Sequence, residues 1–178
     1  MKASRLNGIA VVSIADATKE GTVRDTVLDP NRRRVVALSI QPTGGGPQKT
    51  VSVKDVHSVG RDAVTIRDRD VLRQEHPIRG DSEVMQSKLK GKRVLTERGK
   101  VIGNVAEVEI DPESFSIIGY ELSTGFMSDL TGNREKLSAD DNVHFGRDVF
   151  IVSEPGSARQ PSEGRETRTG EKSHSQRY

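Results

Sequence analysis

The sequence contains no cysteine and no tryptophan, and aromatic residues make up only 3% of its 178 residues. Without cysteine the chain cannot form a disulfide scaffold, a Cys-ligated zinc site or a thiol nucleophile. So few aromatic side chains also exclude a platform on which nucleic-acid bases stack. Hydrophobic residues reach 32%, a low share that indicates small cores or a part of the chain without a core.

Long apolar segments are lacking as well. No run approaches the roughly 20 apolar residues that span a bilayer. Met1–Leu6 lacks the charged and then apolar layout of a signal peptide. We therefore expect no direct membrane insertion and a cytoplasmic location.

The chain has only a small excess of positive charge, a net of +2, because 28 Lys and Arg stand against 26 Asp and Glu. The balance conceals an asymmetry: residues 1–80 carry a net charge of +5, whereas residues 81–153 carry −4. Opposite potentials attract. We expect the two halves to pair, either within one chain or between chains as a homo-oligomer.

An internal repeat organises most of the sequence. Gly21–Pro30 aligns with Gly103–Pro112 at an offset of 82 residues, and both segments end in Asp-Pro. Gly60-Arg61-Asp62 aligns with Gly146-Arg147-Asp148 at an offset of 86. The change of offset indicates a four-residue insertion in the long loop of the second copy. Repeats in the same order predict two copies of one structural unit.

Each copy predicts short strands separated by turn residues, and neither contains a long segment with helical spacing. The first copy predicts strands at Ile9–Ile14, Gly21–Leu28, Arg34–Ile40, Lys49–Val53 and Ala63–Arg67. The second copy predicts strands at Arg93–Thr96, Gly103–Ile110, Ser116–Leu122, Glu135–Ser138 and Val149–Val152. Alternating apolar residues predict that one face of each strand is buried and the other partly wet.

Local signals refine the second and third strands of each copy. Asp29-Pro30 and Asp111-Pro112 predict the turns of two hairpins, because Pro presets φ and Asp can accept a hydrogen bond from the backbone. The apolar phase slips near Asp25 and Glu107, which predicts a β-bulge in each strand. Gly21 and Gly103 are expected at tight corners, where a Cβ does not fit.

The repeat predicts the domain organisation. Residues 1–69 form a first barrel, 70–86 a linker and 87–153 a second barrel. Residues 154–178 contain no Val, Ile, Leu or Phe and cannot bury enough apolar surface to offset the entropy of ordering. The predicted fold is all-β: two tandem small antiparallel barrels followed by a disordered tail.

The repeated pattern is Gly-x-Val-x-acid, Asp-Pro, an alternating strand, and Gly-Arg-Asp before a last strand. It resembles the PRC-barrel family, and it occurs over Lys2–Arg69 and Ser87–Ser153. This family includes the cytoplasmic domain of the photosynthetic reaction centre H subunit and the C-terminal domain of a ribosome maturation factor. The resemblance implies an SH3-like β-barrel that docks onto a larger assembly, and it carries over no catalytic motif.

Three carboxylates, Glu107, Glu109 and Asp111, fall on one face of a regular strand and could hold a hard cation. The first copy has Val27 in place of the middle acid. We therefore interpret them as a solvated outer face and predict no metal site and no cofactor.

Two segments are candidates for binding a partner. Arg32, Arg33 and Arg34 lie at the predicted hairpin tip, where guanidinium groups could reach carboxylates or phosphates; ordinary solvated turn residues are the alternative. Phe126, Met127 and Leu130 lie in the long loop of the second copy. They either pack over the barrel end or form a docking surface, since Phe and Met favour interface centres.

Together these features predict a non-enzymatic protein-binding or scaffolding module of two barrels. The alternative is an accessory factor that binds RNA or a ribosomal protein during ribosome assembly. RNA is the weaker choice, because without aromatic side chains the arginines offer only sequence-independent phosphate attraction.

Overall fold

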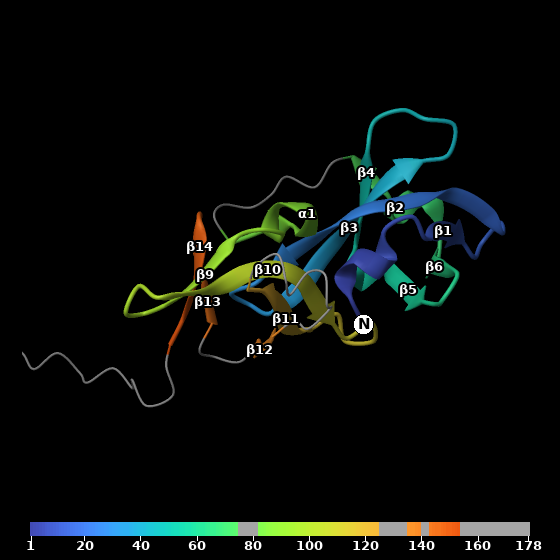
Figure 1. The fold of residues 1–178 in the computed structure, drawn as a ribbon. Coiled ribbons are helices and arrows are strands. Elements are labelled where there is room, and N and C mark those ends of the chain that lie inside the picture. The colour runs from blue at the N-terminus through green and yellow to red at the C-terminus, as the bar shows by residue number, and fades with distance from the viewer. Residues whose placement is uncertain (75–81, 125–134, 140–142, 154–178) are drawn as a thin grey trace, which may run out of the picture.

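The computed structural model describes residues 1–74, 82–124, 135–139 and 143–153. It is mostly β, with two strongly curled half-barrel sheets that lie side by side (Figure 1). We call residues 1–74 the first unit and residues 82–153 the second unit. The predicted all-β class is confirmed. The predicted disordered tail, residues 154–178, lies outside the described residues.

The first unit supplies seven strands to one sheet. They are β1 (Ala10–Ser13), β2 (Thr18–Asp29), β3 (Arg34–Pro42), β4 (Lys49–Ser52), β5 (Val56–Val59), β6 (Ala63–Ile66) and β7 (Arg73–Gln74). Three 3-10 helices accompany them: η1 (Ala3–Leu6), η2 (Val53–Asp55) and η3 (Arg69–Val71). The strand order is β5-β6-β1-β2-β3-β4-β7.

The second unit repeats this arrangement. It begins with β8 (Val84–Met85) and α1 (Gln86–Leu89), followed by β9 (Arg93–Thr96), β10 (Val101–Ile110), β11 (Ile117–Ser123), β12 (Glu135–Ser138), β13 (Val143–Phe145) and β14 (Val149–Val152). The order β12-β11-β10-β9-β14-β13 equals that of β4-β3-β2-β1-β6-β5. The sequence repeat is therefore a structural repeat.

The predicted hairpins, bulges and corners are present in both units. Strand pairs β2–β3 and β10–β11 are antiparallel, with register shifts between Val23 and Asp25 and between Val105 and Glu107. A Cβ built on Gly21 would lie 2.3 Å from the Gln41 carbonyl oxygen, a contact that no side chain tolerates. A Cβ on Gly103 would lie 3.0 Å from the Ser123 carbonyl oxygen. Bulge and glycine together let each long strand bend.

The structure also contains elements that the sequence did not predict. Strand β5 precedes β6 and β13 precedes β14, and each pairs antiparallel with the strand that follows it. Two further pairs of short strands are parallel, β1 with β6 and β9 with β14. Strands β7 and β8 lie within residues 70–86, the predicted linker, and both add to the first sheet.

The two units exchange their leading segments. Strand β8 of the second unit pairs with β2 through Met85 and Val27. Lys2, the repeat counterpart of Met85, forms a bridge with Glu109 of β10. Both hairpin turns meet at the centre, where the Val35 amide donates to the Phe115 carbonyl and the Ile117 amide to the Arg33 carbonyl, each at 2.8 Å. These reciprocal contacts relate the units by an approximate two-fold axis.

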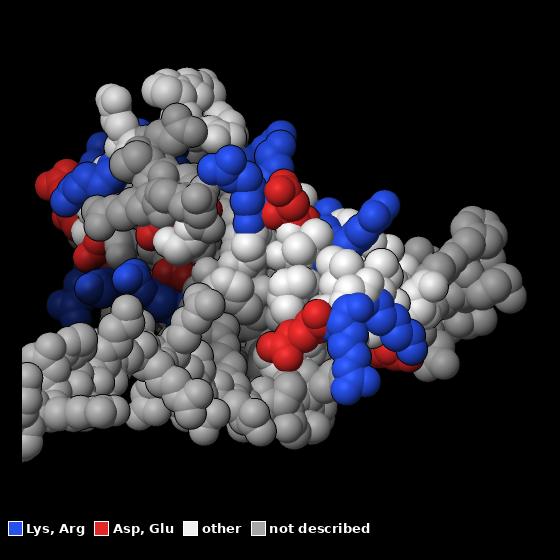
Figure 2. All heavy atoms as spheres, turned by 90° about the vertical axis from the view of Figure 1, so that its left-hand side faces the viewer, with Lys and Arg blue, Asp and Glu red and all other residues white. Residues whose placement is uncertain are grey.

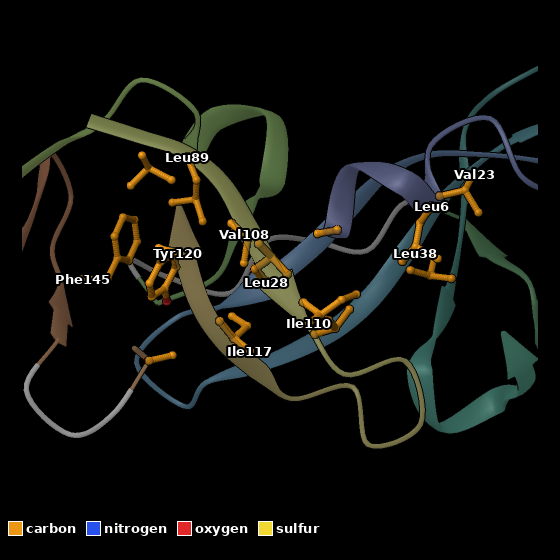
Figure 3. Packing of buried hydrophobic residues seen from close by; sticks show 14 of the residues in the cluster. Leu6, Val23, Leu28, Leu38, Leu89, Val108, Ile110, Ile117, Tyr120 and Phe145 are labelled. Carbon is orange, nitrogen blue, oxygen red and sulfur yellow. The ribbon is translucent and has the colours of Figure 1, made fainter. Parts of the chain in front are cut away.

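A single hydrophobic cluster extends through both units. Leu28, Val108 and Ile110 lie in its middle, between the two long hairpins (Figure 3). Tyr120 packs edge-on against Phe150 in the second unit, with ring centroids 5.1 Å apart. The prediction of one partly wet face is wrong for β3, because Val35, Ala37 and Ser39 are buried as fully as Leu38 and Ile40.

Candidate docking surface

The tip of the β2–β3 hairpin is organised by Asp29. Its fully buried side chain accepts a hydrogen bond from the Arg32 amide at 3.0 Å through Oδ1, and its Oδ2 lies 3.6 Å from the Arg32 guanidinium. Asp in this position stabilises the tight turn. The acid therefore holds Arg32 at the surface, where its side chain is 68% exposed.

Arg33 points away from its two neighbours. It has a left-handed backbone with φ of +52°, as does its repeat counterpart Phe115 with φ of +56°. The Arg33 guanidinium donates to the carbonyl of Ala139 in the second unit at 3.1 Å. The predicted three-arginine cluster is thus divided: Arg33 joins the units, whereas Arg32 and Arg34 face a surface hollow.

This hollow, which we call the arginine hollow, has a volume of about 530 Å³. Three cations, one acid, two serines and three valines line it: Arg32, Arg34, Lys54, Glu83, Ser52, Ser82, Val35, Val36 and Val53. Ser52 caps η2 by accepting from the Lys54 amide. Among these described residues the positive charges outnumber the negative one, and guanidinium groups suit carboxylate oxygens.

Three acids predicted as one solvated face occupy three different environments. Glu107 is buried, contrary to the prediction, and accepts hydrogen bonds from the Ser4 hydroxyl, the Gln86 side chain and the Val108 amide. Glu109 pairs with Lys136 at 2.8 Å. Asp111 accepts from the Ser114 hydroxyl at 2.6 Å, and this hydrogen bond, the largest cause, lowers the pKa of Asp111.

The contact between Ser4 and Glu107 has a symmetric counterpart. Ser87 donates from its hydroxyl to Asp25, which is also buried and also accepts from the following amide, that of Thr26. Each unit thereby presents a carboxylate to the leading segment of the other. The serines recur at an offset of 83 and the acids at 82, so the repeat held a signal for this junction that the sequence analysis missed.

Among the described residues, one ion pair joins the two units: Lys2 of the first unit lies 2.8 Å from Glu121 of the second unit. On the face of the molecule drawn in Figure 2, positive and negative side chains are interspersed rather than separated by sign. Among the described residues, apolar packing and backbone hydrogen bonds also join the units. The candidates Phe126, Met127 and Leu130 lie outside the described residues.

The fold defines the class of this protein: a duplicated β protein built from two small, curled half-barrel sheets. Residues 82–159 match the family model of the PRC-barrel domain. The chain thus carries one PRC-barrel domain, and the matching strand order of residues 1–74 indicates a second barrel-like domain that the match does not include. No curated protein matches the chain. Across the described ranges, no helix has the length and apolar character needed to cross a membrane.

Proposed function

We propose that this protein is a non-enzymatic docking module that binds an acidic segment of a partner protein in the arginine hollow. The observation that carries the proposal is the placement of Arg32, Arg34 and Lys54 around one hollow that the half-buried Val36 and Val53 also line. Cations there can hold carboxylates while Val36 and Val53 contact apolar side chains, which suits a peptide that carries both acidic and apolar residues.

The arrangement of the hairpin supports this assignment. Asp29 fixes the backbone of Arg32 and lies 3.6 Å from its guanidinium, which limits the side-chain freedom that binding would remove. Among the described residues that line the hollow, the one acid is Glu83, and it is buried.

Fluorescence anisotropy tests the proposal. A labelled peptide of alternating Glu and Leu is titrated with the full chain and with Arg32→Gln/Arg34→Gln. Loss of two charge-assisted contacts is expected to weaken binding about tenfold or more. Arg61→Gln/Arg98→Gln removes the same charge at two other exposed loops and is expected to leave the affinity within about twofold.

Two outcomes contradict the proposal: equal weakening in both double variants, or no binding of the acidic peptide at low salt. The same titration with an oligouridylate of equal charge tests whether RNA, rather than an acidic peptide, is the ligand. Tighter binding of the oligouridylate that also depends on Arg32 and Arg34 would replace the peptide by RNA as the ligand class.

A further inference from the structure

A second hollow adjoins the arginine hollow, and we call it the Arg67 hollow. It has a volume of about 390 Å³ and is lined by Lys54, Asp55, Val56, His57, Arg67 and Val71. Lys54 lines both hollows. Residues 52–54 line the arginine hollow and residues 54–57 line the Arg67 hollow, so one continuous stretch of chain leads from the first to the second.

The shared stretch is held by local hydrogen bonds and by strand pairing. Ser52, the last residue of β4, caps η2 by accepting from the Lys54 amide at 3.4 Å. Val56 follows directly after η2 and pairs with Ile66, the last residue of β6. Arg67 is the next residue after Ile66. The pairing of β5 with β6 therefore brings Arg67 to the same surface as Lys54.

Both hollows combine exposed cations with half-buried valines. The exposed cations are Arg32, Arg34 and Lys54 in the arginine hollow and Lys54 and Arg67 in the Arg67 hollow, and the half-buried valines are Val36 and Val53 in the first and Val56 and Val71 in the second. Cations suit carboxylates, and half-buried valines suit apolar side chains. The two hollows thus offer the same kinds of contact along one path.

We infer that a single extended segment of the partner protein, carrying both acidic and apolar residues, passes over Lys54 and occupies both hollows, with one of its carboxylates on Arg67. The inference rests on the proposed function, because it extends the same binding site. Once the segment is held in the arginine hollow, its contacts in the Arg67 hollow form within one complex and raise the affinity. An extended chain advances about 3.3 Å per residue, so eight residues reach about twice as far as four.

Fluorescence anisotropy with two peptide lengths tests the inference. Labelled peptides of alternating Glu and Leu, four and eight residues long, are titrated with the full chain at about 0.15 M salt, which screens long-range attraction. The variants are Arg67→Glu and, as the matched control, Arg24→Glu. Arg24 is also exposed, belongs to β2 of the same unit and lines neither hollow. Circular dichroism verifies that both variants remain folded.

The eight-residue peptide is expected to bind the unaltered chain about tenfold more tightly than the four-residue peptide. Arg67→Glu should weaken the long peptide about tenfold and the short one by less than about twofold, whereas Arg24→Glu should change both by less than about twofold. Equal affinity of the two peptides, equal weakening of both by Arg67→Glu, or equal effects of the two variants would overturn the inference. If the short peptide still depends on Arg32 and Arg34, the proposed function stands without it. If neither peptide binds, the proposed function fails, and the inference fails with it.

Discussion

The side chain of Asn31 and the backbone of Phe145, 114 residues apart in sequence, are joined by two hydrogen bonds of 3.1 and 2.9 Å. The Asn31 amide donates to the Phe145 carbonyl, and its oxygen accepts from the Phe145 amide. The Asn31 side chain of the first hairpin thereby bonds to the backbone at the end of β13. Glu113, the repeat counterpart of Asn31, makes no equivalent bond among the described residues.

Replacing Asn31 should weaken the junction between the units. Asn31→Ala leaves both backbone groups of Phe145 without these partners and should lower the free energy of unfolding by about 1–2 kcal/mol. Glu113→Ala is the matched control and should change it by less than about 0.5 kcal/mol. Urea denaturation measures both. Equal effects of the two substitutions would contradict a stabilising role of the Asn31–Phe145 hydrogen bonds.

Glu107 should matter more than its neighbour Glu109. Glu107→Ala removes the acceptor of the Ser4 hydroxyl and the Gln86 side chain in a buried site, so the expected loss is about 2–3 kcal/mol. Glu109→Ala breaks a more exposed ion pair with Lys136 and should cost less than about 1 kcal/mol. Thermal unfolding of the two variants measures the difference in stability. A larger loss of stability in Glu109→Ala than in Glu107→Ala would contradict the prediction.

Gly21 should tolerate no side chain. In Gly21→Ala the added Cβ would approach the Gln41 carbonyl oxygen to 2.3 Å, which forces β2 and β3 apart. We expect a destabilisation of about 3 kcal/mol. Gly146→Ala meets its nearest atom at 3.5 Å, an ordinary contact, and should change the unfolding free energy by about 0.5 kcal/mol or less. Denaturant midpoints compare them, and similar values would refute the close-approach argument.

Titration of Asp111 should depend on Ser114. Because the Ser114 hydroxyl donates to the ionised carboxylate, it lowers the pKa of Asp111 below the value in the unfolded chain. The resulting stabilisation is present above the unfolded pKa and is lost as the pH falls through the folded pKa. Ser114→Ala should raise the pKa of Asp111, and Ser114→Thr should largely preserve it. Carboxyl chemical shifts measured against pH report both; an unchanged pKa in Ser114→Ala would exclude the hydroxyl as the cause.

Local features were predictable from the sequence, and features formed by distant residues were not. The turns at Asp29 and Asp111 and the bulges after Val23 and Val105 follow from neighbouring residues, so they were found. Strands β5 and β13 were missed because each is short and has a histidine among its apolar residues. Their strand character comes from pairing with β6 and β14 rather than from their own pattern.

The candidate site shows the same division. The three adjacent arginines were recognised, but sequence adjacency could not reveal that the left-handed backbone of Arg33 turns it towards Ala139. Lys54 was not predicted as a partner of Arg32 and Arg34, because β4 and η2 bring it to the hollow only after folding. Glu107 was assigned to solvent because a strand viewed alone gives no sign of the first unit, whose Ser4 contacts Glu107.

Because each leading segment pairs with the other unit, neither unit has its full set of strand contacts alone. A fragment ending at residue 74 would hold Lys2 without its partner Glu109, and a fragment starting at residue 82 would hold β8 without β2. A chain broken between the units would therefore behave as an obligate heterodimer of two incomplete halves. Before duplication, an ancestor with this geometry would have been a homodimer whose identical subunits traded their first residues.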